Sequence, residues 1–325
     1  MTRDDVPTLT IAVDAEAATD RDSWLALMDQ IGEEAGHFQP LGARHWAFFV
    51  DESPILLVSF ESLDEIRADQ PGQMPLGHAI ASGQGWSHLC LIADGETWYR
   101  DPAVYGYFDR LVDDAFFEDF DRVVFYGAGM GGYAACAFSV TAPGATVVAV
   151  QPVATLDPAV VGWDRRHLGQ RRLNFTDRYG YAPDMTEGTG EVFVVVDPVQ
   201  VPDAMHAALF RRPHVTVLRC PHLGDRLEVA LSHMQILTPM IEAAGEGRLT
   251  PAAFARLWRA RRQFGPYLRQ MLTLSEQAGH LSRAARVCRS VTNRMSAPRF
   301  RKRLAELEAL MAAPPEPPSA SPPGQ

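Results

Sequence analysis

The sequence predicts an α/β fold with a mostly parallel sheet covered by helices on both faces. Two observations support this prediction. In the centre of the 325-residue chain, short apolar runs typical of buried strands alternate with segments of helical periodicity. The composition, 46% hydrophobic and 22% charged residues, suffices for one large domain and an appendage. The predicted central strands are 122–126, 146–150, 191–196 and 215–220, and the predicted helices are 132–141, 202–210 and 226–244.

The N-terminal region precedes this alternating pattern. Residues 1–22 are polar, and we expect them to be loosely ordered. A helix is expected over 24–34, with Asp22 or Ser23 as its N-cap, because short polar side chains satisfy the free N–H groups at a helix start.

Four further elements are expected between this helix and the centre. The apolar runs 45–50 and 55–60 are separated by four residues that include Asp, Ser and Pro, which predicts a β-hairpin. Ser62 and Glu65 have the spacing of a capping box and indicate a helix start. A buried strand is expected at 89–93, and aromatic and aliphatic spacing predicts a helix over 101–117.

The chain is expected to divide into a main domain and a helical appendage. We assign residues 23–247 to the α/β domain, in which the long connection 152–190 either caps a site or is an insertion. Residues 250–311 form arginine-rich helices, and 272–294 resembles one tetratricopeptide-like hairpin that must pack on the main domain or on a partner. Residues 313–325 are rich in Pro and Ser, which predicts a disordered tail.

The charge balance limits the choice of partners. The net charge of −10 makes nucleic acid an unfavourable partner, because an acidic surface repels phosphate backbones. The basic side chains of the last quarter are expected to form solvated helix faces, and an anionic partner is the alternative. They are Arg256, Arg259, Arg261, Arg262, Arg269, Arg283, Arg286, Arg289, Arg294, Arg299, Arg301, Lys302 and Arg303.

The cysteines and the apolar runs indicate the compartment. Cys90, Cys136, Cys220 and Cys288 are widely spaced and form no CxxC pair, so we expect neither a zinc site nor another cofactor. The first three lie in or beside apolar runs and are expected to be small core residues in a reducing cytoplasm. No apolar run approaches the roughly 20 residues that cross a bilayer.

Residues 123–135, V-V-F-Y-G-A-G-M-G-G-Y-A-A, are the most informative motif. They predict a strand, a glycine-rich turn and a helix of small residues. Gly127, Gly129 and Gly132 match G-x-G-x-x-G, the phosphate turn of dinucleotide-binding folds. The same residues also match G-x-S-x-G-G, a nucleophile elbow in which Gly129 replaces the serine.

The position of this turn argues against the dinucleotide interpretation. In dinucleotide-binding folds the turn follows the first strand, and an acidic residue about 20 positions later binds the ribose. Here three predicted strands precede the turn, and the next strand ends at Gln151-Pro152 without an acidic residue.

The downstream sequence favours the elbow. In hydrolases of this kind the catalytic acid and histidine follow the nucleophile in that order, each after a strand. Strand 191–196 is followed by Asp197, and strand 215–220 by His222. The alternatives for both side chains are structural: a strand-end turn for Asp197 and a loop position without a role for His222.

The stretch 127–135, G-A-G-M-G-G-Y-A-A, resembles the α/β-hydrolase elbow G-x-S-M-G-G-Y-A-A, with Gly129 in place of serine. The resemblance extends through the strand and helix order over roughly residues 40–245. Similar chains often continue after the last strand with P-H-x-G-H, in which the second histidine is catalytic. Here that position is Asp225, which we expect to cap the helix that follows. The resemblance therefore implies a hydrolase frame that departs from the family pattern at nucleophile and base.

The whole chain also resembles proteobacterial proteins labelled phosphoadenosine phosphosulfate reductase. That resemblance implies reduction of a sulfonucleotide by a cysteine nucleophile. Reductases of that kind carry S-G-G-x-D-S and E-C-G-x-H motifs, and neither string occurs in this sequence. The similar stretches are G-W-S-H-L-C-L at 85–91, R-D-P-A-V-Y-G-Y-F-D-R at 100–110 and N-F-T-D-R-Y-G-Y-A-P-D at 174–184.

The sequence thus predicts a non-catalytic α/β-hydrolase-like protein that binds a small molecule or a protein partner. Glycine supplies no nucleophilic atom, whereas N–H groups at the start of the following helix favour an anion. The alternatives are an acyl hydrolase with a relocated nucleophile, the sulfonucleotide reductase, and a dinucleotide-binding oxidoreductase. Arg165 and Arg166 belong to a polar cluster that lines the site as a lid or is a solvated loop. The expected ligand-binding residues are Gly127, Gly129, Met130, Gly131, Arg165 and Arg166.

Overall fold

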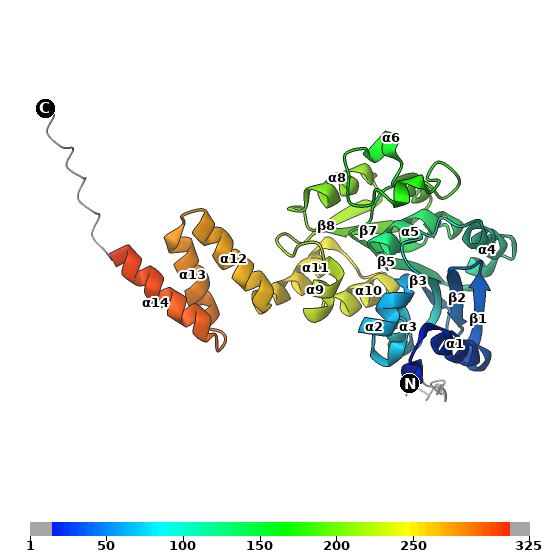
Figure 1. The fold of residues 1–325 in the computed structure, drawn as a ribbon, viewed down its shortest axis with the longest axis horizontal. Helices are drawn as coiled ribbons and strands as arrows, with labels where there is room; N and C mark the ends of the chain where they lie inside the picture. The colour runs from blue at the N-terminus through cyan, green and yellow to red at the C-terminus, as the bar shows by residue number, and fades with distance from the viewer. Residues whose placement is uncertain (1–14, 313–325) are drawn as a thin grey trace, which may run out of the picture. The chain divides into compact units, whose positions relative to one another are not determined.

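A computed structural model describes residues 15–312 and contains one eight-stranded sheet (Figure 1). Its strand order is β1-β2-β4-β3-β5-β6-β7-β8; β2 is antiparallel to β1 and β4, and the remaining pairs are parallel. This order, with helical crossovers between the parallel strands, is the α/β-hydrolase fold and confirms the predicted class. The strands are β1 Gly36–Leu41, β2 His45–Val50, β3 Ile55–Ser62, β4 Ser87–Ala93, β5 Arg122–Ala128, β6 Thr146–Val150, β7 Glu191–Val196 and β8 Val215–Arg219.

Helices cover both faces of this sheet, and Figure 1 shows α4, α5 and α8 on one face and α1, α3 and α10 on the other. The first face holds the large aromatic core, and the second packs α1 and α2 against β2 and β4. No helix among residues 15–312 is both long and apolar enough to cross a bilayer. The helices of this unit are α1 Arg21–Ala35, α2 Leu63–Asp69, α3 Leu76–Gln84, α4 Pro102–Asp113, α5 Met130–Phe138, α6 Pro158–Val161, α7 Ala182–Met185, α8 Val201–Leu209, α9 Leu227–His233, α10 Leu237–Gly245 and α11 Pro251–Leu257.

The predicted hairpin is wrong, although both of its strands exist. β2 and β3 are separated in the sheet by β4, which pairs antiparallel with β2 and parallel with β3. The hairpin partner of β2 is instead β1, whose mixed sequence, G-H-F-Q-P-L, gave no strand signal. All residues of β4 are buried, as expected for a strand inside a sheet. Its two neighbours, β2 and β3, are consecutive in the sequence.

Several helix ends also differ from expectation. The N-cap of α1 is Asp20, which accepts the Ser23 N–H at 2.8 Å, so neither Asp22 nor Ser23 is the cap. Ser62 does precede α2, but its side chain makes no capping hydrogen bond. The helix expected over 226–244 is two helices, α9 and α10, separated by Gln235 at φ +55°.

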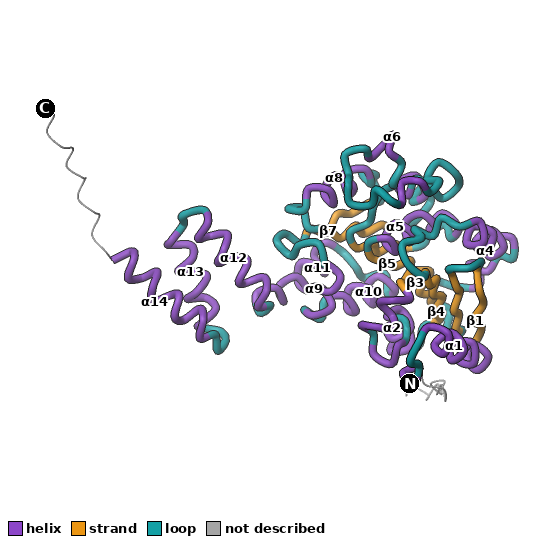
Figure 2. Tube along the Cα trace, in the orientation of Figure 1, coloured by secondary structure: helices purple, strands orange, loops and turns teal. Residues whose placement is uncertain are grey.

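The connection between β6 and β7 is mostly loop, interrupted by α6, a 3₁₀ turn and α7 (Figure 2). Arg100 attaches this connection to the rest of the domain. Its side chain is buried and donates to the main-chain oxygens of Asn174 and Arg178, at 2.8 and 3.0 Å. The Tyr133 hydroxyl on α5 donates to the carbonyl of Tyr179 at 2.8 Å. These hydrogen bonds fix the connection against the rest of the domain.

The chain divides into two compact units between Trp258 and Arg259. The second unit contains α12 Gly265–Gln277, α13 Leu281–Thr292 and α14 Pro298–Ala312. The predicted hairpin corresponds to α12 and α13, and α14 packs on α13, with Phe300 and Leu307 in their shared core. This third helix covers an apolar face that a lone hairpin leaves open. The predicted tail 313–325 lies outside the described residues, as does most of the segment 1–22.

Candidate functional site

The elbow forms where β5 turns into α5. Gly129 lies at the turn with φ +53° and ψ −113°, and its N–H donates to the Val150 carbonyl at 2.9 Å. A Cβ added to Gly129 would meet no atom within 4 Å, and the residue is partly exposed. Backbone at positive φ is strained for residues other than glycine and often occurs at functional turns. The turn therefore has room for a side chain at the nucleophile position, although glycine stands there.

The neighbouring glycines serve close packing. A Cβ on Gly127 would lie 2.2 Å from the Gly131 carbonyl oxygen, and one on Gly131 would lie 2.2 Å from the Phe60 carbonyl oxygen. Both contacts are with backbone, which cannot move aside as a flexible side chain can. Gly127 and Gly131 thus let α5 approach β3 and β5, and their packing accounts for the glycine at both positions.

Trp98 lies beside the elbow and was missed by the sequence analysis. Its backbone N–H donates to the Met130 sulfur at 3.0 Å, and its ring is 4.9 Å from that of His167. Trp98 and Tyr99 both have positive φ, +54° and +52°, an unusual conformation for two large aromatic residues. No sequence motif identifies this loop, because only the long-range contact with Met130 places Trp98 beside the elbow.

Asp197 lies against the loop that carries His222, but its contacts are with the main chain of that loop. Asp197 is fully buried, and its Oδ2 accepts the N–H groups of Leu223 and Gly224, each at 2.8 Å. Its Oδ1 accepts the Val199 N–H at 2.9 Å. His222 itself has φ +69°, and its ring makes no hydrogen bond within residues 15–312. Asp197 therefore anchors the loop that carries the histidine, instead of bonding the imidazole.

Asp225, expected to cap the next helix, does not do so. The N-cap of α9 is Arg226, without a capping side chain. The first N–H group of α9, on Leu227, is satisfied by Gln151, whose Oε1 accepts it at 2.9 Å. Gln151 also donates to Asp203 on α8 at 2.7 Å, so this residue ties together the starts of two helices.

Arg166 pairs with two buried carboxylates, although its own side chain is 37% exposed. Its guanidinium pairs with Asp164 at 2.8 Å and with Asp203 at 2.5 Å. His206 Nδ1 accepts the Ala154 N–H at 3.2 Å, so His206 Nε2 carries the proton and donates to Asp164 at 2.9 Å. Burial raises the pKa of Asp164, but the bonds from Arg166 and His206 outweigh it and hold that pKa well below its usual range. An anion at Arg166 would have to compete with two carboxylates.

Arg165 is exposed as well, but no ion pair of its guanidinium is found in the part of the chain that the structure describes. Arg165 is therefore more available to bind an anion than Arg166.

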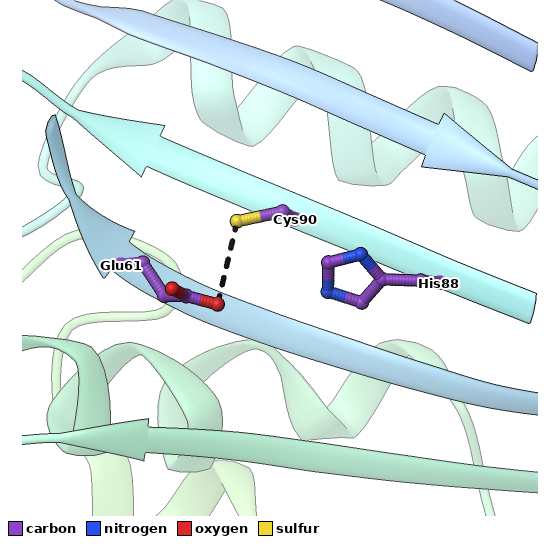
Figure 3. Close-up of side chains that lie close together, drawn as sticks. All are labelled: Glu61, His88 and Cys90. Carbon is purple, nitrogen blue, oxygen red and sulfur yellow. Dashed lines mark hydrogen bonds between the residues drawn. The ribbon is translucent and has the colours of Figure 1, made fainter. Parts of the chain in front are cut away.

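A second polar cluster lies on the opposite face of the sheet, where Figure 3 shows Glu61, His88 and Cys90 side by side. The Ser59 hydroxyl lies 2.7 Å from Glu61 Oε1 and 2.9 Å from His88 Nε2. The Cys90 sulfur is 3.8 Å from the same Glu61 oxygen. Glu61 also accepts the N–H groups of Leu76 and Gly77 at the start of α3, at 2.6 and 2.9 Å.

Alternation along two strands assembles this cluster. Ser59 and Glu61 are two residues apart on β3, as are His88 and Cys90 on β4, and side chains two apart share a face. This polar i, i+2 pattern in two apolar strands was the available sequence signal. A third group follows on the same face: Tyr126 of β5 donates to the carboxylate of Glu228 on α9.

No family model matches the chain, and no curated protein matches it in sequence. The chain is similar to a solved esterase domain of a Rhodothermus marinus protein, with 14% identity over 61% of this chain and 92% of that chain, at a TM-score of 0.39.

Two other solved esterases are similar to the same extent. Est1E from Butyrivibrio proteoclasticus, solved with ferulic acid, has 11% identity over 64% of this chain and 98% of that one, at a TM-score of 0.43. A Pyrobaculum calidifontis esterase has 12% identity over 70% and 90%, at 0.41. Likenesses at these values carry no argument about function, and the fold assignment rests on the strand order and the elbow.

Proposed function

We propose that this chain is a non-catalytic α/β-hydrolase-like protein that binds a small ligand or a protein partner at its elbow. The observation that carries the proposal is Gly129, which has the turn conformation and the open space of a nucleophile position but no reactive atom. The acid position supports it, since both oxygens of Asp197 already accept main-chain N–H groups. These contacts stabilise the loop, and no imidazole bonds to Asp197 among residues 15–312.

The start of α5 is where a ligand would bind. No side chain caps this helix, because its N-cap is Gly129. The first N–H groups of a helix lack partners within it and favour an anion or another acceptor. Met130 and Gly129 are partly exposed, so an acceptor can approach. We include Gly127, Gly131, Arg165 and Arg166 in the proposed site as its supporting and flanking residues.

The sulfonucleotide-reductase alternative lacks an accessible thiol. A cysteine nucleophile must be reachable as a thiolate. Cys90, Cys136, Cys220 and Cys288 are all buried and free of disulfides, which also suits a cytoplasmic location. Burial raises the pKa of both Cys90 and Cys136, which opposes thiolate formation.

A relocated serine nucleophile is also poorly supported. Ser59 is the serine with a histidine and a glutamate beside it, but it is fully buried. Its proton goes to Glu61, an acceptor-only carboxylate, so its oxygen accepts from His88. In that arrangement His88 is a donor and does not act as a base toward Ser59.

A fluorophosphonate probe tests the absence of catalysis. We expect the purified wild-type chain to remain unlabelled under conditions in which an active esterase is labelled in one-to-one ratio. The reason is that no accessible hydroxyl stands at the elbow. Stoichiometric labelling, with the modified serine located by mass spectrometry, would refute the proposal in favour of a relocated nucleophile.

Thermal-shift measurements with short-chain carboxylates and phosphonates test ligand binding. We expect at least one of these anions to raise the Tm of the wild type, because binding to the folded state alone is stabilising. Gly129→Leu should abolish that rise by occupying the open space at the elbow.

Gly188→Leu is the matched control. Gly188 also has a positive φ, +93°, and no atom within 4 Å of an added Cβ. Both substitutions should therefore cost a similar 1–3 kcal/mol, roughly, in backbone strain. A ligand response that survives in Gly129→Leu, or disappears equally in Gly188→Leu, would place the binding site elsewhere.

A further inference from the structure

The buried cluster on the second face of the sheet contains three kinds of metal ligand. A carboxylate oxygen of Glu61, a ring nitrogen of His88 and the sulfur of Cys90 all lie within 4.8 Å of one another (Figure 3). His88 and Cys90 are fully buried, while Glu61 keeps part of its surface exposed. Carboxylate, imidazole and thiolate are the protein ligands of Zn²⁺.

The spacing of these donors suits a tetrahedral ion. With zinc–sulfur and zinc–oxygen bonds of about 2.3 and 2.0 Å, two ligands of a tetrahedron lie about 3.5 Å apart. The Cys90 sulfur and Glu61 Oε1 are 3.8 Å apart, and no pair of the three donors exceeds 4.8 Å. Small side-chain rotations therefore suffice to close the three donors around one ion. The Ser59 hydroxyl, next to Glu61 and His88, adds an oxygen for the fourth position.

The bonds of the Glu61 carboxylate leave a place for a cation. Within the described residues its partners are the Ser59 hydroxyl, the Cys90 thiol and the N–H groups of Leu76 and Gly77, and no arginine or lysine pairs with it. A divalent cation would therefore be the first positive charge bonded to this carboxylate.

One polar atom in the cluster lacks a partner. His88 Nδ1 is buried and makes no hydrogen bond within the described residues. A second imidazole ring, that of His78, lies 6.0 Å from the ring of His88. Because Nδ1 has no partner, the ring proton can move to it and leave the lone pair of Nε2, which faces Ser59, for an ion.

We propose that Glu61, His88 and Cys90 form a Zn²⁺ site that fastens β3 and β4 to the start of α3. Glu61 reaches α3 through the Leu76 and Gly77 N–H groups, so an ion bound to Glu61 links three elements. Binding deprotonates the Cys90 thiol, whose proton goes to solvent, and moves the His88 proton from Nε2, beside Ser59, to the unpartnered Nδ1, so that Nε2 binds the ion without any oxidation or reduction. The site is independent of the elbow, so it stands or falls apart from the proposed ligand binding.

Metal analysis of the full chain is the first test. After unfolding with chelator and refolding with Zn²⁺, we expect one equivalent of zinc per chain and a Tm about 5 °C above that of protein refolded without metal. Refolding in the presence of the ion removes any barrier to entry into a buried site. With Co²⁺ instead, a thiolate-to-cobalt charge-transfer band is expected.

Cys90→Ser should lose the charge-transfer band and most of the bound zinc. Cys136→Ser is the matched control, because Cys136 is equally buried but lies in the aromatic core on the other face. It should keep both signals. If Cys90→Ser fails to fold, Glu61→Gln provides the second variant, with loss of the zinc-dependent rise in Tm. Wild-type protein that holds no zinc after refolding with Zn²⁺ and shows no charge-transfer band with Co²⁺ overturns the proposal, as does equal zinc binding by Cys90→Ser and Cys136→Ser.

Discussion

The two faces of the central sheet are built from the same strands but have different chemistry. On the face covered by α4, α5 and α8, Phe60 of β3 stacks with Phe108 and Phe138. The three ring centroids lie 4.3 to 6.0 Å apart, with interplanar angles of 20° or less. On the opposite face the neighbouring residues are Ser59 on β3 and Tyr126 on β5. Alternate positions of one strand thus supply an aromatic core and a polar layer.

The two faces differ in how their buried groups are satisfied. The aromatic face is held mainly by the packing of rings, whereas the polar face depends on a few specific hydrogen bonds. Glu61 binds the start of α3, and Tyr126 binds Glu228. Buried polar groups are costly without partners, so we expect the stability of the polar face to depend on its hydrogen-bonding groups. We expect the stability of the aromatic face to depend on side-chain volume.

Phe108→Ala is expected to have the largest effect, because it removes one of the three rings of the aromatic stack. Phe108 is fully buried, and its ring lies 4.3 Å from that of Phe138. The free energy of unfolding should fall by about 3–5 kcal/mol in urea denaturation. Val112→Ala, one turn away on α4 and 48% exposed, is the control and should change it by about 0.5 kcal/mol or less. A loss below about 1 kcal/mol for Phe108→Ala would contradict the role of packing on this face.

Ser59→Ala should have a smaller effect on the polar face. It deletes the hydroxyl that joins Glu61 to His88, leaving both ring nitrogens of His88 without a partner in the apo protein. We expect the free energy of unfolding to fall by about 1–3 kcal/mol.

The control is Ser139→Ala, since Ser139 is also fully buried but bonds mainly to the Cys136 carbonyl of its own helix. Its loss should stay near 1 kcal/mol. Equal losses for the two serines would mean that the cluster has no special cost.

The sequence predicts the aromatic face better than the polar one. Apolar alternation locates β3 to β8 and α5 within a few residues, because burial of hydrophobic side chains dictates those positions. The neighbours of β4 could not be predicted, because strand pairing depends on long-range contacts. Likewise Trp98 and Met130 are 32 residues apart, and only the fold brings them together.

The candidate site illustrates the same limit. The turn chemistry identifies Gly129, since its glycine neighbours follow a local pattern. The partners of Asp197 are main-chain N–H groups of Leu223 and Gly224, which any sequence at those two positions would provide. Sequence reasoning can therefore place the acid beside the histidine loop but cannot tell a catalytic contact from a structural one.

The smallest expected effect is a change in stability with pH that arises from the polar face. Burial raises the pKa of Glu228 to about 7 from an ordinary value of 4.5, so the folded state holds this proton more tightly than the unfolded state. The stabilisation is complete below pH 4.5 and is lost as the pH rises through 7. Because Glu228 is partly exposed, solvent screening limits it to about 1–2 kcal/mol.

Urea denaturation at pH 5.5 and pH 8 measures this contribution. Glu228→Gln should remove the corresponding fall in the free energy of unfolding, whereas Glu187→Gln, at an exposed position, should keep it. Tyr126→Phe should move the fall to higher pH, because the tyrosine hydroxyl lowers the pKa of Glu228 by bonding to its charged form. Identical pH profiles for the wild type and Glu228→Gln would show that the carboxylate keeps its ordinary titration, and the polar layer would then be as indifferent to pH as the aromatic core behind it.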